Sequence, residues 1–316
     1  MNEHSDPANK VRIGDAALAH LRQVSDQPDV SGTRYEVLAP LGRGGMGAVW
    51  RARDLQLDRE VALKVSSEHD PEFARALEAR LADEAKVLAK LEHPGIVPVH
   101  DVGQLPDGRA FYAMKLVRGS RLDELVRAGL PIAESLRIFA RIAEAVAFAH
   151  SRGVIHRDLK PTNVMVGEFG EVLVLDWGLA RGLLATEPIE GDERAGTVGF
   201  MAPEQQRGGQ VADVRSDVFA LGRVLATFRI SGRAMTAIVA KATAEQPSDR
   251  YGGVGELAED VARFQTGDAV RALREGLLTR LGRWHRKYKI AVWLVASYAL
   301  LRIGFEIARL WFGNSR

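Results

Sequence analysis

Residues 156–163 read HRDLKPTN and hold two basic side chains, an aspartate and an asparagine within eight positions. The segment before them, LRIFARIAEAVAFAHSRG (136–153), has the apolar spacing of an amphipathic helix. The segment after them, NVMVGEFGEVLVLD (163–176), reads as a short hairpin. The charged stretch between these two elements is therefore the first candidate for a functional site.

A second charged group stands at the end of that hairpin. In LVLDWGLAR (173–181), Asp176 follows an apolar run and precedes a tryptophan and a glycine. Asp and Gly are common turn residues, so one interpretation is a strand that stops at a turn. The other is a metal ligand held at the rim of a site, and the rest of the chain decides between them.

The composition limits the classes of function. The chain of 316 residues is 46% hydrophobic and 27% charged, as expected for a globular protein with a substantial core. It has no cysteine, which excludes disulfides and thiolate metal sites. The 43 basic residues are balanced by 41 acidic ones. This balance argues against a general nucleic-acid binder, and no nucleic-acid partner is expected.

The order of the predicted elements indicates the fold class. Residues 1–33 are polar and read as an N-terminal extension. From Tyr35 the pattern changes to strand-like runs, and residues 118–266 read mainly helical. The runs are YEVLAPLG, AVWRARD, EVALKVSS, GIVPVHDVG and AFYAMKLV, with the helical stretch FARALEARLADEAKVLAKLEH after the third. We therefore predict an α+β, two-lobed domain with a cleft between a β-rich N-lobe with one helix (35–117) and a mainly helical C-lobe (118–266).

A glycine-rich stretch, LGRGGMGAV, joins the first two runs and fits the pattern G-x-G-x-x-G-x-V. Glycines let a backbone pass close to a phosphate and point its N–H groups at it. The same spacing occurs in plain turns and in dinucleotide-binding folds, but a strand follows here rather than a helix, which counts against the latter. The candidate nucleotide-binding residues of this stretch are Leu41, Gly42, Arg43, Gly44, Gly45, Met46, Gly47, Ala48 and Val49.

Lys64 lies in the apolar strand VALK. An unpaired buried ammonium group is costly, so this lysine needs a partner unless its strand is an edge strand in solvent. The functional interpretation is a phosphate contact that also pairs with an acid. Glu84 is the candidate acid, because it shares the spacing of Leu81 and Leu88 on the inward face of the helical stretch.

Together these motifs resemble the eukaryotic-type (Hanks-type) protein kinases. The family's glycine-rich loop, V-A-I-K, H-R-D-L-x-x-x-N, D-F-G and A-P-E all have counterparts in the same order, the last four being VALK, HRDLKPTN, DWG (176–178) and APE (202–204). Lys160 and Thr197 look like the serine/threonine-specific branch, and the chain looks most like bacterial members. The resemblance covers residues 35–266, and five ordered motifs make it specific.

The resemblance implies ATP and Mg²⁺ as cofactors and serine or threonine hydroxyls of proteins as substrates. Asp176 and Asn163 would be the metal ligands. Asp158 would accept or orient the proton of the substrate hydroxyl, and Lys160 would neutralise charge on the transferred phosphoryl group. The lysine–glutamate pair of the N-lobe belongs to the same catalytic set.

The same resemblance also implies roles for residues around the adenine and at the hinge. The adenine would be enclosed by apolar residues whose alternative interpretation is ordinary core, and the backbone after the gatekeeper position would supply hinge contacts. These residues are Leu41, Val49, Ala62 and Met165 around the adenine, Met114 as gatekeeper, and Lys115 and Val117 at the hinge. Trp177 departs from the family by replacing the usual phenylalanine, and we expect it to pack near Leu88 and His156.

A second departure lies in the C-lobe. By the resemblance, Asp217 anchors the backbone of the catalytic loop and Arg250 pairs with Glu204. Only 33 positions separate Asp217 from Arg250, where the family normally has an extra helix and loops that help to dock protein substrates. This keeps an alternative open, a nucleotide-binding pseudokinase or scaffold that acts through protein interactions. A dehydrogenase would need a helix directly after the glycines, and a strand is predicted there.

The end of the chain predicts a membrane anchor. Residues 267–289 form a basic segment with seven Arg or Lys side chains, and residues 290–312 span 23 mainly apolar positions, enough to cross a bilayer. Arg302, Glu306 and Arg309 interrupt this segment, so an interfacial helix or a helix packed on another protein are alternatives. Because basic residues precede it, we predict a single-pass anchor in the cell membrane with a cytoplasmic kinase domain. A homodimer is compatible with the sequence, although no feature of it establishes an oligomeric state.

Overall fold

The structure of the protein is a computed structural model. It describes residues 27–44, 47–66, 85–177, 181–182, 199–207, 213–273, 293–295 and 297–304. Several predictions fall on residues outside these ranges, namely Gly45, Met46, Glu84, Gly178, Thr197 and most of the two terminal segments. The described residues divide into two compact units. The first unit takes those up to Glu124 with 148–156 and 162–182, and the second takes 125–147, 157–161 and those from Gly199 onward.

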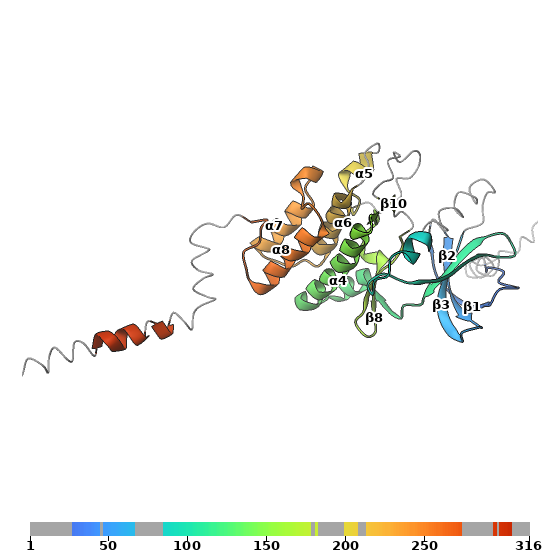
Figure 1. Ribbon diagram of the computed structural model, residues 1–316, viewed down its shortest axis with the longest axis horizontal. Helices are drawn as coiled ribbons and strands as arrows, with labels where there is room; N and C mark the ends of the chain where they lie inside the picture. Colours follow the sequence, from blue (N-terminus) through green and yellow to red (C-terminus); the bar gives the residue numbers. More distant parts are fainter. Residues whose placement is uncertain are drawn as a thin grey trace, which may run out of the picture. The chain divides into compact units, whose positions relative to one another are not determined.

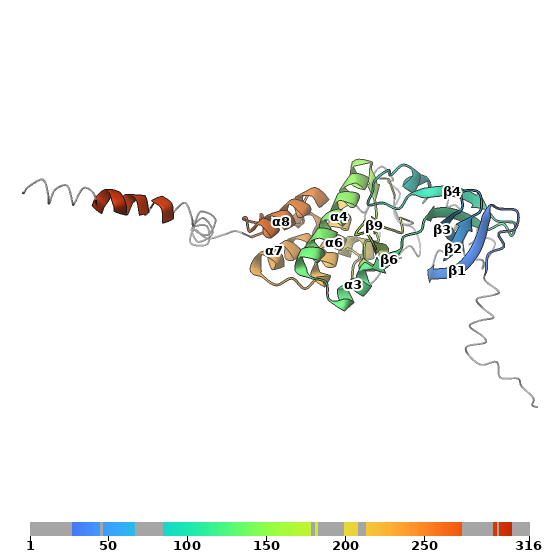
Figure 2. The ribbon, with the colours of Figure 1, turned by 90° about the horizontal axis from the view of Figure 1, so that it is seen from below.

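A five-stranded antiparallel sheet occupies the N-terminal part of the first unit. Its strands are β1 (Tyr35–Gly44), β2 (Gly47–Asp54), β3 (Arg59–Val65), β4 (Val99–Gln104) and β5 (Ala110–Lys115). Their order in space is β1-β2-β3-β5-β4, and every neighbouring pair is antiparallel (Figure 2). The five residues from Val61 to Val65 are all buried, as expected for the middle strand of a sheet.

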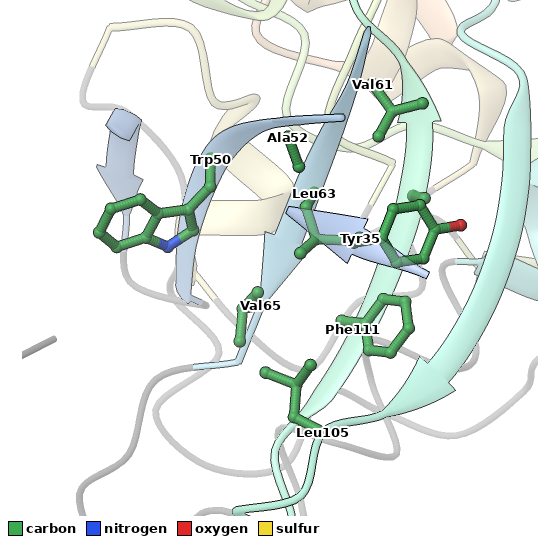
Figure 3. Close-up of a cluster of buried hydrophobic side chains, with 9 residues drawn as sticks. Tyr35, Trp50, Ala52, Val61, Leu63, Val65, Leu105 and Phe111 are labelled. Atoms are coloured by element: carbon green, nitrogen blue, oxygen red, sulfur yellow. The ribbon is translucent and has the colours of Figure 1, made fainter. Parts of the chain in front are cut away.

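The core of this sheet is built from alternating side chains of neighbouring strands. Trp50 and Ala52 of β2 point to the same side as Leu63 of β3, and Phe111 of β5 meets the ring of Tyr35 edge-on at 5.6 Å between ring centroids (Figure 3). In β2 the alternate residues, Arg51 and Arg53, are exposed. This two-residue period places the large apolar groups on one face of the sheet.

Two smaller pairings complete the first unit. The strands β6 (Gly119–Arg121), β8 (Val164–Gly167) and β9 (Val172–Val174) form an antiparallel sheet in the order β6-β8-β9, and β7 (Val154–Ile155) pairs with β10 (Arg181–Gly182). On the side of β9 away from β8, Val174 forms an isolated β-bridge with Ile96. The end of β9 is therefore held from both sides, directly before the aspartate at position 176.

Residues 85–89 are helical and lie between β3 and β4, and the labelled helices follow the sheet in sequence. They are α3 (Leu122–Ala128), α4 (Ile132–Ser151), α5 (Pro203–Arg207), α6 (Val214–Thr227), α7 (Arg233–Ala242) and α8 (Val254–Thr266), with the 3₁₀ turns η1 (Pro161–Asn163) and η2 (Pro247–Asp249). In the second unit α6, α7 and α8 lie side by side (Figures 1 and 2).

Local sequence explains where these helices begin and end. In α4 the residues Leu136, Phe139 and Ile142 are buried at three-residue spacing, as the amphipathic pattern requires. The carboxylate of Asp213 accepts the Arg215 N–H at 2.8 Å and caps the start of α6. Helix α8 ends at Gly267, whose φ of +73° is the left-handed conformation typical of a glycine after a helix.

The predicted α+β arrangement is confirmed, with an antiparallel sheet first and mainly helices after it. Of the predicted membrane segment 290–312, residues 293–295 and 297–304 are described; they are helical and their large apolar side chains are exposed. No helix within the described ranges combines the length and the apolar composition needed to cross a membrane. The remainder of the segment lies outside those ranges.

Candidate active site

The glycine-rich stretch forms the closed end of the β1–β2 hairpin. Gly44 lies opposite Gly47, and Gly42 lies opposite Val49. Gly47 has a φ of +145°, and a Cβ there would lie 2.1 Å from the Val65 carbonyl oxygen, so only glycine fits. A Cβ at Gly42 would meet no heavy atom within 4 Å. The same motif thus contains one glycine required by the fold and one that borders open space, as a phosphate-binding backbone needs.

Lys64 is paired with the aspartate that ends the β8–β9 hairpin. Its Nζ donates a hydrogen bond to Oδ1 of Asp176 at 2.8 Å. The lysine is buried, whereas 46% of the Asp176 side chain is exposed. Lys64 Nζ also lies 5.6 Å from the ring centroid of Tyr112, its cross-strand neighbour in β5. The first unit therefore holds an ammonium group in apolar surroundings beside a carboxylate that a ligand can reach.

Neither of these two contacts was predicted. The sequence assigned Lys64 to Glu84, which lies outside the described residues, and it gave Asp176 a separate role. Lys64 and Asp176 are 112 positions apart, so no local pattern joins them. Tyr112 could have been found from strand pairing alone, because a residue opposite the lysine in the neighbouring strand must lie beside it.

Asp176 and Asn163 stand together at the open end of the β8–β9 hairpin. The N–H of Leu175 donates to the carbonyl oxygen of Asn163 at 2.8 Å, which extends the ladder by one residue beyond Val174. Asp176 then adopts a φ of +62°, which ends the strand. Both interpretations of this aspartate are therefore compatible, because a residue that ends a strand presents its carboxylate at the edge of the sheet.

Carboxylate and amide oxygens are the hard donors that Mg²⁺ prefers, so Asp176 and Asn163 fit this ion. Among the residues that the structure describes, no three His, Cys, Asp or Glu side chains gather into a metal site. Two protein ligands leave most of an octahedral shell to other oxygens, and phosphate groups and water are its usual source. The donor set thus fits a magnesium ion that arrives with a nucleotide.

The residues Asp158 and Lys160 belong to the second unit. Lys160 Nζ donates to Oδ2 of Asp158 at 2.7 Å, and both side chains are largely buried. The backbone of Arg157, the residue before Asp158, is held through both its N–H and its carbonyl group. The N–H of Arg157 donates to Oδ1 of Asp217 at 2.9 Å, as predicted, and its carbonyl accepts from Gln205 Nε2 at 3.2 Å. This anchoring holds Arg157 at a φ of +71° and sets the direction in which the Asp158 side chain leaves the loop.

The residues predicted around the adenine and the hinge lie on strands of the first unit. They are Leu41 in β1, Val49 in β2, Ala62 in β3, Met114 and Lys115 in β5, and Met165 in β8, with Val117 just after β5. Ala62 and Met114 are cross-strand neighbours. Leu41 is 51% exposed, so ordinary core packing does not account for it.

Trp177 is fully buried and its ring centroid lies 4.5 Å from that of His156, which confirms the predicted contact between the two. The indole N–H donates to the carbonyl oxygen of Val174 at 3.2 Å. This hydrogen bond was not predicted. A phenylalanine, the usual residue of the D-F-G motif, has no N–H to make it.

The predicted ion pair between Glu204 and Arg250 is confirmed in the second unit. Arg250 donates from Nη1 and Nη2 to the two carboxylate oxygens, each at 2.7 Å, and both side chains are buried. Burial by itself raises the pKa of the Glu204 carboxyl. The hydrogen bonds and charge of Arg250, together with a hydrogen bond from Ser216, outweigh burial and place this pKa below its ordinary value of 4.5. The pair is therefore ionised at neutral pH and joins α5 to the turn after η2.

A glycine hairpin, a buried lysine paired with an exposed aspartate and an anchored aspartate–lysine loop define a nucleotide-dependent phosphotransferase. The family model described as a protein kinase domain matches residues 35–250. The chain belongs to this family, and its kinase domain is of the Hanks-type serine/threonine class.

Curated bacterial kinases are similar to this domain. The chain is 45% identical over 197 residues to the DNA damage-responsive serine/threonine-protein kinase RqkA of Deinococcus radiodurans, a match that covers 61% of this chain and 29% of the relative. It is 39% identical over 197 residues to the serine/threonine-protein kinase PrkC of Bacillus subtilis, covering 61% and 30%. For the serine/threonine-protein kinase PknB of Mycolicibacterium smegmatis the identity is 35% over 278 residues, covering 75% and 44%. The matches thus span less than half of each of these relatives.

Proposed function

We propose that the chain is a protein serine/threonine kinase that transfers the γ-phosphoryl group of ATP, with Mg²⁺, to protein hydroxyls. The observation that carries this proposal is the 2.8 Å ion pair between Lys64 and Asp176. It brings a cation suited to phosphate, from β3, next to a carboxylate suited to Mg²⁺, from the segment after β9.

The roles of the residues follow from their chemistry. Bound Mg²⁺ would supply positive charge at the phosphate oxygens. Asp176 and Asn163 hold the ion, and Lys64 contacts the phosphates. Asp158 accepts or orients the proton of the substrate hydroxyl, and its own orientation is set by the hydrogen bond from Lys160.

The test is phosphoryl transfer by the full chain. Wild-type protein with γ-labelled ATP and Mg²⁺ is expected to label serine or threonine on itself or on a generic basic protein. Asp158→Asn is expected to reduce the rate by about 100-fold or more while ATP still binds, because a positioned acid–base group contributes at least that much. Lys64→Met is expected to abolish labelling and weaken ATP binding. Lys90→Met removes an exposed lysine of the same unit and is the matched control.

A second candidate function is a nucleotide-binding scaffold. It is favoured by the short interval in the second unit, where α6 ends at Thr227 and α7 begins at Arg233 with only five residues between them. Wild-type protein that binds ATP with Mg²⁺ but labels no protein would favour this function. Wild-type protein that does not bind ATP would exclude both.

We also propose that residues 290–312 anchor the chain as a single-pass segment in the cell membrane, with the kinase domain cytoplasmic. The basic segment before it and the apolar side chains exposed on the helical residues support this, among them Trp293, Leu294 and Leu301 at 63%, 66% and 74% exposure. Large apolar side chains exposed on a helix are stabilised by an apolar environment.

Alkaline carbonate extraction of membranes from cells that express the full chain tests the anchor. A spanning helix stays with the membrane, and Leu294→Arg with Leu301→Arg is expected to release the chain, because an arginine at the centre of the span, as at position 301, costs about 2.5 to 3.5 kcal/mol. Leu55→Arg with Leu57→Arg alters two exposed leucines of the β2–β3 turn and is the matched control. Release of the wild-type chain would instead indicate an interfacial helix.

A further inference from the structure

Gln205 of α5 bonds two separate stretches of backbone in the second unit. Its Nε2 donates to the carbonyl oxygen of Arg157 at 3.2 Å, and its Oε1 accepts the N–H of Ala202 at 3.1 Å. The first stretch is the loop that carries Asp158, the residue after Arg157, and the second is the turn that leads into α5. The side chain of Gln205 therefore bridges the loop and the turn.

The chemistry of the two partners explains why a glutamine stands at this position. A carbonyl oxygen accepts and needs a donor, whereas a backbone N–H donates and needs an acceptor. Among unbranched side chains of this length, glutamate only accepts, lysine only donates, and glutamine alone carries both groups at its end. The bridge therefore requires the carboxamide of Gln205.

Helix α5 gives this side chain a fixed base. Glu204, which precedes Gln205, is buried and forms two hydrogen bonds with Arg250 at 2.7 Å each. It also accepts the hydroxyl of Ser216 in α6 at 3.0 Å. A side chain that leaves an anchored helix can hold a loop in place, because the donor end of its hydrogen bond does not move with the loop.

The loop depends on such contacts. Arg157 has a φ of +71°, a left-handed conformation that residues with a Cβ rarely adopt, and it keeps this conformation only if its surroundings determine it. Asp217 holds the N–H of Arg157, and Gln205 holds its carbonyl. This carbonyl belongs to the planar peptide group that joins Arg157 to Asp158. Gln205 therefore fixes the peptide plane directly before the catalytic aspartate.

We propose that Gln205 is a positioning residue for Asp158. By holding the peptide group between Arg157 and Asp158, it keeps the carboxylate in the orientation that receives the proton of the substrate hydroxyl. This role rests on the proposed kinase function, whereas the bridge is a property of the second unit alone. The competing explanation is that Gln205 only stabilises α5 and its turn, in which case it does not act through Asp158.

Replacements of Gln205 in the full chain separate these explanations. Gln205→Met keeps the length of the side chain and removes both hydrogen bonds, whereas Gln205→Glu keeps the acceptor for the Ala202 N–H and removes only the donor to Arg157. Gln206→Met is the matched control. Gln206 is the next residue of α5, and its exposed side chain donates from Nε2 to the Met201 carbonyl at 2.8 Å rather than to the catalytic loop.

The first readout is kcat for transfer from labelled ATP with Mg²⁺ to a generic basic protein. Both replacements of Gln205 are expected to lower kcat by about 5-fold or more, since one hydrogen bond contributes about that factor and a misplaced acid–base group slows the transfer further. The Kd of ATP is expected to stay unchanged, because the predicted ATP contacts lie in the first unit. Gln206→Met is expected to keep the wild-type kcat.

A double replacement tests whether Gln205 acts through Asp158. In a chain that already carries Asp158→Ala, Gln205→Met is expected to cause no further loss of rate, because the carboxylate that it positions is absent. A general weakening of the fold would lower the rate by the same factor in both chains. Equal factors in the two chains, or a wild-type kcat in Gln205→Glu, would overturn the proposal.

The second readout needs no nucleotide. Hydrogen exchange of the Arg157 amide, which is bonded to Asp217, is expected to become about 5-fold faster in Gln205→Met and to stay unchanged in Gln206→Met. If the wild-type chain labels no protein, the proposed function is wrong, and exchange alone decides whether the bridge holds the loop. Unchanged exchange of this amide in Gln205→Met would show that it does not, whatever the activity.

Discussion

Gly42 and Gly47 are the first and last glycines of one sequence motif, and they differ in their surroundings. Gly47 combines a left-handed φ with a close approach to the backbone of β3. Gly42 has ordinary φ and open space. The two glycines therefore meet different requirements. Gly47 allows the hairpin to form, and Gly42 leaves room for a phosphate to come close.

Gly47→Ala is expected to destabilise the first unit by about 2 kcal/mol or more, because the new methyl group meets the Val65 carbonyl oxygen and the backbone is strained. Gly42→Ala is the matched control and is expected to change stability by less than about 0.5 kcal/mol. Denaturant unfolding followed by circular dichroism measures both. Equal effects at the two positions would contradict this assignment.

The motifs of the sequence single out candidate site residues but not the contacts between them. Lys64, Asp158 and Asp176 each sit in a short motif, and a motif is a local property. The bond between Lys64 and Asp176 depends on how distant strands meet, and the left-handed backbone of Asp176 depends on its buried neighbours. Neither the bond nor this backbone conformation produces a periodic pattern in the sequence.

At the scale of the element, the packing of α6 on α7 depends on one small residue. A Cβ at Gly222 of α6 would lie 2.7 Å from Cβ of Ala242 and 2.8 Å from Cγ2 of Thr243. A Cβ has no rotamer by which to move aside, so the two helices would have to separate. Gly222 thus sets the distance between these helices.

Gly222→Ala is expected to destabilise the second unit by about 1 to 3 kcal/mol through overpacking, although alanine favours a helix over glycine by about 1 kcal/mol. Gly255→Ala in α8 is the matched control. Its Cβ would meet no heavy atom within 4 Å, so it is expected to stabilise by up to about 1 kcal/mol. Thermal unfolding of the two variants gives the comparison, and a stabilising Gly222→Ala would show that the helices are not in tight contact.

The elements themselves were largely predictable, and their ends were not. The spacing of apolar residues located the strands and α4, because burial on one face imposes that spacing. Helix α4 begins at Ile132, four residues before the predicted segment. Ile132 and Ala133 at its start are exposed, so burial does not mark them as part of the helix.

At the scale of the whole molecule, stability depends on pairs that join distant parts of the chain. Glu204 and Arg250 are 46 positions apart and connect α5 to the turn before α8. Removing one partner of a buried pair leaves the other charge uncompensated, which costs about 3 to 5 kcal/mol. This pair is therefore the point at which acid is expected to weaken the second unit.

The pH dependence follows from the lowered pKa of Glu204. Protonation of this carboxyl favours the unfolded state, so the stabilisation is fully present above about pH 4.5 and is lost as the pH falls through the lower pKa of the folded protein. Glu204→Gln is expected to lower the melting temperature at pH 7, and its difference from wild type is expected to shrink below pH 4.5. Other carboxyl groups titrate alike in both proteins and cancel in this difference.

Glu259→Gln is the matched control for this measurement. Glu259 pairs with Arg263 at 2.9 Å on the exposed face of α8, where an ion pair contributes at most about 0.5 kcal/mol. Its melting temperature is expected to follow that of wild type from pH 7 to pH 3.5. A difference in melting temperature between Glu204→Gln and wild type that stays constant over this range would mean that the pKa of Glu204 is the same in the folded and unfolded states. The buried pair would then stabilise the second unit through its shape and hydrogen bonds alone, and acid sensitivity would have to come from other carboxylates.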